Sequence, residues 1–361
     1  MSIYQRLLDL GKAGRPTAIA TVVRTQGSTP QVVGAKLVVV ADAERGKAAG
    51  TLGGGCVEAD AILAAREVLD RGGRSVRAYQ LTEDLAWNTG LVCGGTMWIL
   101  AEPAGDVLTI GGRDVTGDLQ RAADGGPPVA LATLFARTGR DLGYVGRLMV
   151  DVSGRQTGSI DATAFDAKVV SAAAAQLPHG TARLVPIDDT HDVLVEPVVG
   201  QPKLVIAGGG HVALAITRQA LLLDFDVTVI EDRPEFADPA RFGGARVIAA
   251  DNIATAIASI DYGWSSFIVV ATRGHKMDAD CVLAAVKTEA RYIGLLGSRR
   301  KTILIADMLR EQGVSDDRVR AIRAPVGLDL GGRTPAEIAL SVMAEITKER
   351  YAGSGGALSR V

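Results

Sequence analysis

The 361-residue chain is poor in the residue types that mark several protein classes. Its three cysteines, Cys56, Cys93 and Cys281, have no Cys-x-x-Cys spacing, which argues against a disulfide framework. Its four histidines are scattered, so we expect no structural zinc site. Aromatic residues make up only 4% of the chain, no lysine or arginine run is interleaved with them, and the formal charge is −2. We therefore expect no nucleic-acid partner.

Long apolar runs are also missing. No stretch of about eighteen apolar residues occurs, and a membrane-spanning helix needs such a run. The chain begins Met-Ser-Ile-Tyr-Gln-Arg, without the apolar part of a secretory signal. We therefore expect no membrane span and a cytoplasmic location. The length allows two or three domains, and the abundant glycine, valine and isoleucine are typical of α/β proteins. This composition is also compatible with a homodimer.

The segment from Gly50 to Glu58 is rich in glycine and contains a thiol. It reads Gly-Thr-Leu-Gly-Gly-Gly-Cys-Val-Glu and precedes a predicted helix over residues 57–69. Glycine allows close approach to a ligand, and free N–H groups at a helix start attract anions. The same field favours the thiolate form of a nearby cysteine such as Cys56. The pattern suggests a phosphorylated ligand that bears metal or sulfur. The alternative is a tight turn with a buried cysteine.

The residues before position 200 contain an internal repeat. Residues 16–22, Pro-Thr-Ala-Ile-Ala-Thr-Val, return as residues 128–134, Pro-Val-Ala-Leu-Ala-Thr-Leu. Each copy predicts strand, turn, strand, short strand, helix, strand, strand, so together they predict one α+β domain with pseudo-twofold symmetry. The glycine loop and the Cys93-Gly94-Gly95 segment have no counterpart in the second copy. This favours a functional role for them; the alternative is decay of the second copy while the first kept a tight turn for packing.

The C-terminal part has the pattern of a Rossmann fold. A buried strand over residues 203–207 is followed by Gly-Gly-Gly-His-Val-Ala and a predicted helix over residues 213–223. This is a G-x-G-x-x-A motif in its required context. The motif residues are Gly208, Gly210 and Ala213. The acids Glu231 and Asp232 end the next strand, where a carboxylate binds ribose hydroxyls, which favours NAD or another adenosine nucleotide over NADP.

Further strands are predicted over residues 246–249, 267–272, 292–296 and 319–324. A 3-2-1-4-5 strand order makes the first and fourth strands neighbours at the switch point, where ligands bind. His211 and His275 follow these two strands, so both could face one crevice as acid or base groups. The alternative is a structural hydrogen-bonding role. Cys281 is interpreted as a core residue.

The chain resembles the XdhC/CoxI family, accessory factors of molybdenum hydroxylases such as xanthine dehydrogenase. The resemblance covers nearly the whole chain. The matching segments are residues 25–30 (Thr-Gln-Gly-Ser-Thr-Pro), 50–58, 93–95, 208–213, 232–236, 272–275, 292–298 and 325–337. It implies three parts: a family domain over residues 1–105, a degenerate second copy over 106–200, and a Rossmann-like domain over 201–361.

The resemblance implies a chaperone that binds molybdenum cofactor, not a turnover enzyme. Such proteins present the cofactor for sulfuration and deliver it to a molybdenum hydroxylase client, with a cysteine desulfurase as sulfur source. The phosphate-binding residues would be Gly53, Gly54 and Gly55, with hydroxyl groups from Thr51 or Ser28. Cys93 or Cys56 would supply a thiolate near molybdenum, and Cys93 stands at the more typical family position. The alternatives are an NAD-dependent oxidoreductase that uses the Rossmann crevice and a regulatory or vestigial nucleotide site.

Overall fold

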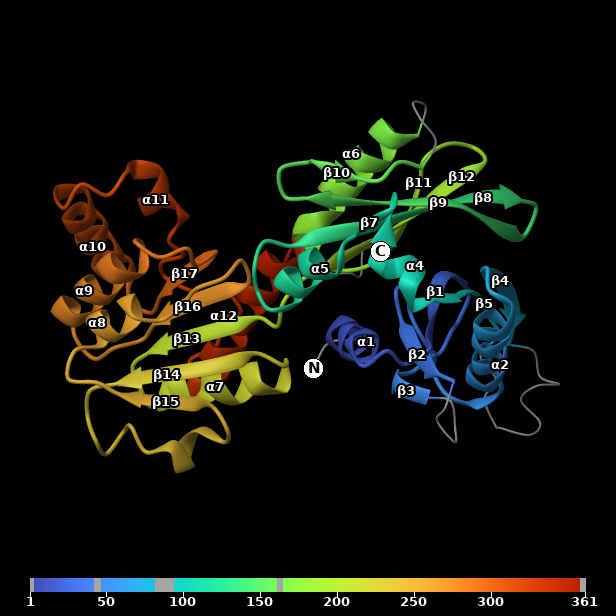
Figure 1. Ribbon diagram of the computed structural model, residues 1–361. Helices are drawn as coiled ribbons and strands as arrows, with labels where there is room; N and C mark the ends of the chain where they lie inside the picture. The colour runs from blue at the N-terminus through green and yellow to red at the C-terminus, as the bar shows by residue number, and fades with distance from the viewer. Residues whose placement is uncertain (1–2, 42–46, 82–93, 161–164, 358–361) are drawn as a thin grey trace. The chain divides into compact units, whose positions relative to one another are not determined.

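The computed structural model describes residues 3–41, 47–81, 94–160 and 165–357 (Figure 1). The chain divides into two compact units, Met1–Val199 and Gly200–Val361. Each unit has its own sheets and its own core, so each is described separately.

Two five-stranded antiparallel sheets make up the first unit, and they have the same internal order. One sheet runs β3-β2-β1-β5-β4 and the other β10-β9-β8-β12-β11. The first comprises β1 (Thr17–Gln26), β2 (Lys36–Val40), β3 (Lys47–Gly50), β4 (Ser75–Gln80) and β5 (Thr96–Pro103). The second comprises β8 (Val129–Thr138), β9 (Asp141–Asp151), β10 (Gln156–Thr157), β11 (Arg183–Pro186) and β12 (His191–Val198).

One long helix packs on each sheet at the same point of the order. Helix α2 (Gly55–Arg71) contacts β1 and β5, and α6 (Asp166–Gln176) contacts β8 and β12. The order of elements predicted for the two copies is therefore present in both. Their origin from a duplicated ancestral segment stays a prediction.

The strand β1 is buried on both faces because it lies between a helix and the other sheet. Ala18, Ala20 and Val22 pack with α2, while Ile19 packs with residues of the second sheet such as Leu131. The period-2 alternation of a strand sends these two sets to opposite faces. The inner faces of the two sheets thus share one core.

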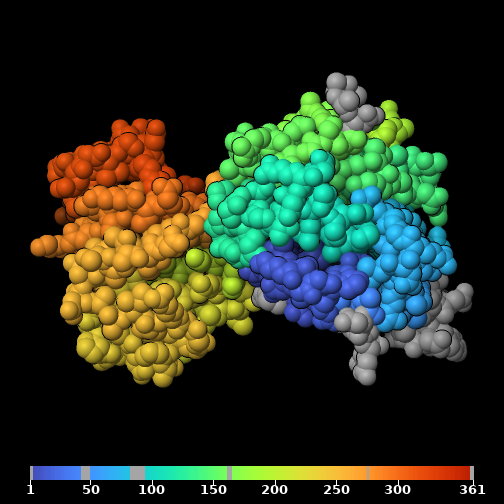
Figure 2. Space-filling view, in the orientation of Figure 1, coloured from blue at the N-terminus to red at the C-terminus, as the bar shows by residue number. Residues whose placement is uncertain are grey.

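Short elements cover the edge of this core. They are α1 (Ile3–Lys12), α4 (Ala104–Leu108), β6 (Thr109–Ile110), β7 (Arg113–Asp114), α5 (Thr116–Ala123) and η1 (Leu177–His179). Helix α1 packs against α5, and Figure 2 shows both at the surface of this unit, in dark blue and teal. The apolar residues Leu7 and Leu10 of α1 are buried in the shared core.

A five-stranded parallel sheet forms the second unit, in the order β15-β14-β13-β16-β17. The strands are β13 (Lys203–Ala207), β14 (Asp226–Glu231), β15 (Arg246–Ala249), β16 (Ser266–Val270) and β17 (Tyr292–Leu295). The helices are α7 (His211–Leu222), η2 (Pro239–Phe242), α8 (Ile253–Ala258), α9 (His275–Ala285), α10 (Arg299–Glu311), α11 (Asp316–Ala321) and α12 (Pro335–Tyr351). The predicted 3-2-1-4-5 order and Rossmann fold are confirmed.

Helices cover both faces of this parallel sheet (Figure 1). Leu204 and Ile206 of β13 pack with α7 and α12, while Val205 and Ala207 pack with α8, α9 and α10. Every β13 side chain from Leu204 to Ala207 is therefore buried, which explains the continuous apolar run in the sequence.

The strand predicted over residues 319–324 is wrong. Residues Asp316–Ala321 form helix α11, whose N-terminal amide at Arg318 is capped by the Ser315 side chain. Two aspartates in the first turn add favourable charge at the helix start. Within residues 319–324, Arg323 alone pairs with β17, through a bridge to Gly294. Local capping therefore outweighed the apolar pattern.

Candidate functional site

Three loops of the first sheet meet where glycines leave room for close packing. A Cβ added to Gly53 would lie 2.6 Å from Cβ of Pro30, and one added to Gly95 would lie 2.3 Å from the carbonyl oxygen of Ser28. A Cβ on Gly27 would lie 3.2 Å from Cα of Gly95. Glycine is required here because larger residues would separate the loops. We call these segments the glycine-loop cluster: residues 27–30, 50–55 and 94–95.

The predicted binding residues of the first copy lie in this cluster. Ser28 pairs with Gly94 through an isolated bridge, which joins the first loop to the third. Cys56 is the second residue of α2 and is half-buried. Cys93 lies outside the described residues, so its predicted role stays a prediction.

The hydrogen-bond donors that were predicted to bind a phosphate contact a carboxylate of the protein itself. Glu58 Oε2 accepts hydrogen bonds from Thr51 Oγ1 at 2.7 Å and from the Leu52 and Gly54 amides at 2.9 and 3.2 Å. The Gly53 amide donates to Thr51 Oγ1 at 3.1 Å. The loop is thus an anion-binding arrangement occupied by an internal anion. Sequence reasoning missed this role of Glu58, although an acid in the first helical turn after a glycine run is its signal.

The second copy makes part of the same contact. The Ile160 amide donates to Asp166 Oδ1 at 2.9 Å, as the Leu52 amide does to Glu58. Both pairs are related by the same offset of 108 positions. A carboxylate at this helix start is therefore common to both halves of the unit. In the first copy this carboxylate also accepts from Thr51 Oγ1 and from the Gly54 amide.

The first strand–helix turn of the Rossmann unit has the geometry that its glycines predict. Gly208 has φ +111°, and a Cβ there would lie 2.5 Å from the carbonyl oxygen of Ala271. Gly210 is the residue before α7, and Ala213 is buried where this helix packs on the sheet. His211 begins the helix and is exposed.

Arginines already bind both acids predicted to contact ribose. The Glu231 carboxylate accepts from the Gly209 amide, from the Arg233 amide at 3.0 Å and from the Arg233 guanidinium at 2.9 and 3.1 Å. Burial alone would raise the pKa of Glu231, but the hydrogen bonds from Arg233 and the Gly209 amide hold this pKa at about 2. Asp232 accepts from Arg273 at 2.7 Å. A ribose hydroxyl would therefore compete with arginine, and the preference for NAD stays a prediction.

A buried ion pair that the sequence did not indicate lies where β16 and β17 end. Asp278 is fully buried, accepts from Thr272 Oγ1 at 2.6 Å and forms an ion pair with Lys301. Lys301 also donates to the Leu296 carbonyl at 3.2 Å, and burial lowers its pKa. The pair holds α9 and α10 to this edge of the sheet.

The predictions for the two histidines and for the third cysteine have different outcomes. His211 and His275 each begin a helix after adjacent parallel strands, β13 and β16. The His275 side chain lies outside the described residues, so convergence of the two rings stays a prediction. Cys281 is fully buried, as expected of a core residue, and burial raises its pKa to about 12.

Comparison with known proteins identifies the family. The XdhC Rossmann domain matches residues 204–346, and the XdhC and CoxI family model matches residues 10–80. The chain belongs to the XdhC and CoxI family. Both candidate regions of this XdhC/CoxI chain have residues within the matched segments, whereas the second antiparallel sheet lies outside them.

Two relatives and one solved structure show how far the similarity extends. A probable xanthine dehydrogenase subunit from Bacillus subtilis is 24% identical over 353 residues, 97% of this chain and 98% of the relative. The uncharacterized protein YqeB of Escherichia coli is 34% identical over 161 residues, 44% of this chain but only 29% of YqeB. A crystal structure described as a xanthine dehydrogenase from Bacillus halodurans has a TM-score of 0.61 at 21% identity, covering 97% of this chain and 96% of its own. It shows a shared fold.

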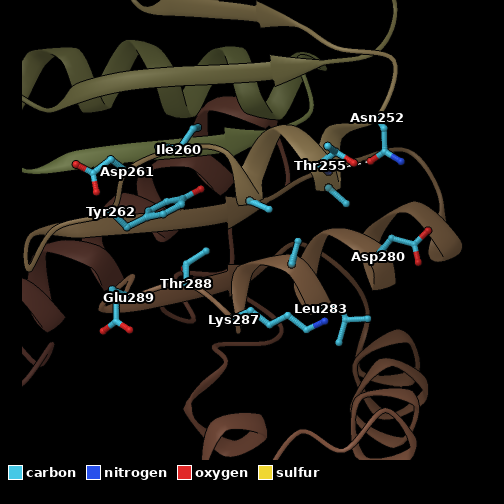
Figure 3. Close-up of a pocket in the computed structure, with 13 residues that line it drawn as sticks. Asn252, Thr255, Ile260, Asp261, Tyr262, Asp280, Leu283, Lys287, Thr288 and Glu289 are labelled. Carbon is cyan, nitrogen blue, oxygen red and sulfur yellow. Dashed lines mark hydrogen bonds between the residues drawn. The ribbon is translucent and has the colours of Figure 1, made fainter.

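A cavity of about 750 Å³ runs along α8 and α9 of this XdhC/CoxI chain (Figure 3). None of the predicted site residues lines it. Two of its polar side chains have partners: the Tyr262 hydroxyl donates to the Ile257 carbonyl at 3.0 Å, and Asn252 accepts from the Thr255 amide at 2.9 Å. In the described part of the chain, no three acidic, histidine or cysteine side chains group to hold a metal ion, and no helix is long and apolar enough to cross a membrane.

Proposed function

We propose that this protein is an accessory factor that binds the molybdenum cofactor as cargo and supports maturation of a xanthine dehydrogenase-type hydroxylase. Family membership and the name of the Bacillus subtilis relative support the client class. The glycine-loop cluster is the observation that carries the binding proposal. Glycines let its three loops pack closely, and its donors bind an anionic oxygen.

The donor set at Glu58 fits a phosphate oxygen. One carboxylate oxygen accepts one hydroxyl and two amide hydrogen bonds there, which is the coordination that a phosphate oxygen prefers. In this proposal the cofactor phosphate takes these donors when Glu58 moves aside, with Ser28 as a further hydroxyl donor. Cys56, and Cys93 by its position in the sequence, would offer soft thiolates toward molybdenum. A cysteine desulfurase would supply the sulfur, and the hydroxylase would receive the cofactor.

Cofactor retention and delivery test this proposal. The chain is incubated with freshly released molybdenum cofactor, desalted, and assayed for pterin fluorescence and for activation of a cofactor-free hydroxylase. Wild type should retain the cofactor and activate the client. Glu58→Gln should retain more of it, because a neutral amide competes less with phosphate for the loop amides, whereas the matched Asp166→Asn variant should behave as wild type. No retention by wild type would remove the proposal.

The thiols need their own test. Cys93→Ala should reduce delivery more than Cys56→Ala, since Cys93 stands at the more typical family position. Normal binding and delivery by both variants would exclude a thiolate role and leave cofactor binding itself intact.

A second candidate function is that of an NAD-dependent oxidoreductase, because the Rossmann unit has the Gly208–Ala213 turn in its proper geometry. Titration with NADH, followed by its fluorescence, tests this. Micromolar binding would favour it, and millimolar or absent binding would favour a vestigial nucleotide site.

A further inference from the structure

Two buried ion pairs cross between the sheets of the first unit in a reciprocal arrangement. Arg147 of β9 donates to Glu102 of β5 at 2.6 and 3.0 Å and to Thr133 Oγ1 at 2.8 Å. Lys36 of β2 pairs with Glu196 of β12 and donates to Thr21 Oγ1 at 3.0 Å. The two basic residues hold the same register, with Thr21 opposite Lys36 and Thr133 opposite Arg147. Each sheet therefore contributes a basic side chain that pairs with an acidic side chain of the other sheet.

The pair at Glu102 is saturated. Its second oxygen accepts from Arg147 and also from Arg74 Nε at 3.3 Å. Arg74 thus donates one N–H to a carboxylate that is already paired with a buried base, while its Nη2 pairs with Asp106 at 2.8 Å. Both oxygens of Glu102 have donors.

The matching pair at Glu196 is not saturated. Lys36 contacts Glu196 through Oε1, and no described residue donates a hydrogen bond to Oε2. Lys36 has three N–H groups, and two of them are used. The nearby Tyr4 hydroxyl is buried without a partner among the described residues, and burial together with the Glu196 charge raises its pKa well above 10. A buried hydroxyl without a partner, such as that of Tyr4, is costly unless a ligand or water completes it.

A cavity of about 310 Å³ lies at this unsaturated pair. Its volume is at the lower end of small-ligand pockets. It is lined by Ile3, Tyr4, Gly34, Lys36, Gly50, Ala182, Glu196 and Pro197. The side chains of Lys36 and Glu196 are only 8% and 6% exposed, so the charged wall is built into the core. Gly50 is also the first residue of the glycine loop, which places the cavity beside the glycine-loop cluster.

We propose that this cavity binds a flat heterocycle with a 2-amino-4-oxopyrimidine edge, in which Glu196 accepts adjacent N–H groups and Lys36 donates to the ring carbonyl. The saturated pair shows why: one N–H of Arg74 completes Glu102, and Glu196 has no such added donor among the described residues, which the adjacent N–H groups of that edge would supply. This edge occurs in pterins and in guanine. The inference rests on the proposed function, because a pterin here would leave the phosphate end of the cofactor near the glycine loop.

Calorimetric titration of the full chain with pterin, guanosine and adenosine tests the cavity directly. Adenosine is the control because it lacks the N–H fork beside a carbonyl. We expect saturable pterin binding, at least tenfold weaker in Glu196→Gln, a few-fold weaker in Tyr4→Phe, and unchanged in Arg74→Met, which alters the saturated pair. If Glu196→Gln does not fold, the loss of pterin affinity in Tyr4→Phe tests the proposal. Guanosine binding without pterin binding would also support the edge chemistry and assign a nucleotide as its source.

The outcomes separate this inference from the proposed function. Absence of binding by all three compounds at millimolar concentration would overturn it, as would equal binding of adenosine. Where pterin is the ligand, cofactor retention that is unchanged in a folded Glu196→Gln variant would also overturn the assignment of this cavity to the cofactor, while the chaperone proposal stands. Pterin binding that depends on Glu196, in a chain that fails to retain whole cofactor, would support the cavity and remove the chaperone proposal.

Discussion

Replacing Glu102 by glutamine should strongly destabilise the first unit. The Glu102 and Arg147 side chains are only 1% and 5% exposed, so the variant leaves a guanidinium buried without its counter-charge. Removing one member of such a pair costs about 3–5 kcal/mol. A unit of this size loses roughly 2–4 °C of Tm per kcal/mol, so we expect a decrease of about 6–20 °C.

Differential scanning calorimetry of the full chain measures this effect, and the transition of the second unit serves as the internal reference. The Glu102→Leu/Arg147→Leu double variant should recover much of the lost stability, because an apolar pair has no uncompensated charge. A double-mutant cycle then gives the coupling free energy. A loss below about 1 kcal/mol in Glu102→Gln, or additive losses in the double variant, would refute the reasoning that charge compensation holds the two sheets together.

Three further predictions concern the glycine loops and the Rossmann unit. Gly95→Ala should lower the free energy of unfolding in urea by about 1–3 kcal/mol, because its Cβ would lie 2.3 Å from a carbonyl oxygen. Gly94→Ala should lower it by only about 1 kcal/mol, because Gly94 has φ +64° but open space around it. Equal losses in the two variants would contradict the packing argument. Glu231 has a pKa of about 2 when folded, against 4.5 ordinarily, so the unfolded chain takes up its proton first as pH falls. The second unit should therefore lose stability between about pH 4.5 and 2, by less than the Glu231 shift alone would give, because the raised pKa of the neighbouring Asp232 acts in the opposite direction. Glu231→Gln should remove that part of the pH dependence, and an unchanged pH profile would count against the hydrogen bonds. Asp278→Asn should destabilise the second unit by about 3 kcal/mol because Lys301 keeps a buried charge, and a loss under about 1 kcal/mol would show that Lys301 reaches solvent.

The strand order of the Rossmann unit was predictable because several local signals agree. The buried run at Lys203–Ala207, the glycine turn at Gly208 and the following helix fix one strand–helix unit, and the later apolar runs repeat it. The strand over residues 319–324 failed because apolar spacing gave no weight to the cap at Ser315. Where the apolar pattern and a helix cap predict different structures for a few residues, the side chain that accepts hydrogen bonds from backbone amides determines the structure.

The site was predictable only in its backbone. The glycines that allow close approach were identified, but the partners of the loop amides depend on how the loop closes on Glu58. The pairing of Lys36 with Glu196 joins residues 160 positions apart and depends on how two sheets face each other. No spacing within either copy encodes that contact. The reciprocal pairs therefore became visible only with the packed structure.

The reciprocal pairing has a consequence for any attempt to divide the first unit. A chain cut between residues 105 and 106 would leave Lys36 and Glu102 on one fragment, and Arg147 and Glu196 on the other. Neither fragment could bury its inner sheet face without an uncompensated charge. We expect the two pieces to be poorly folded when produced separately and to reconstitute the fold when mixed.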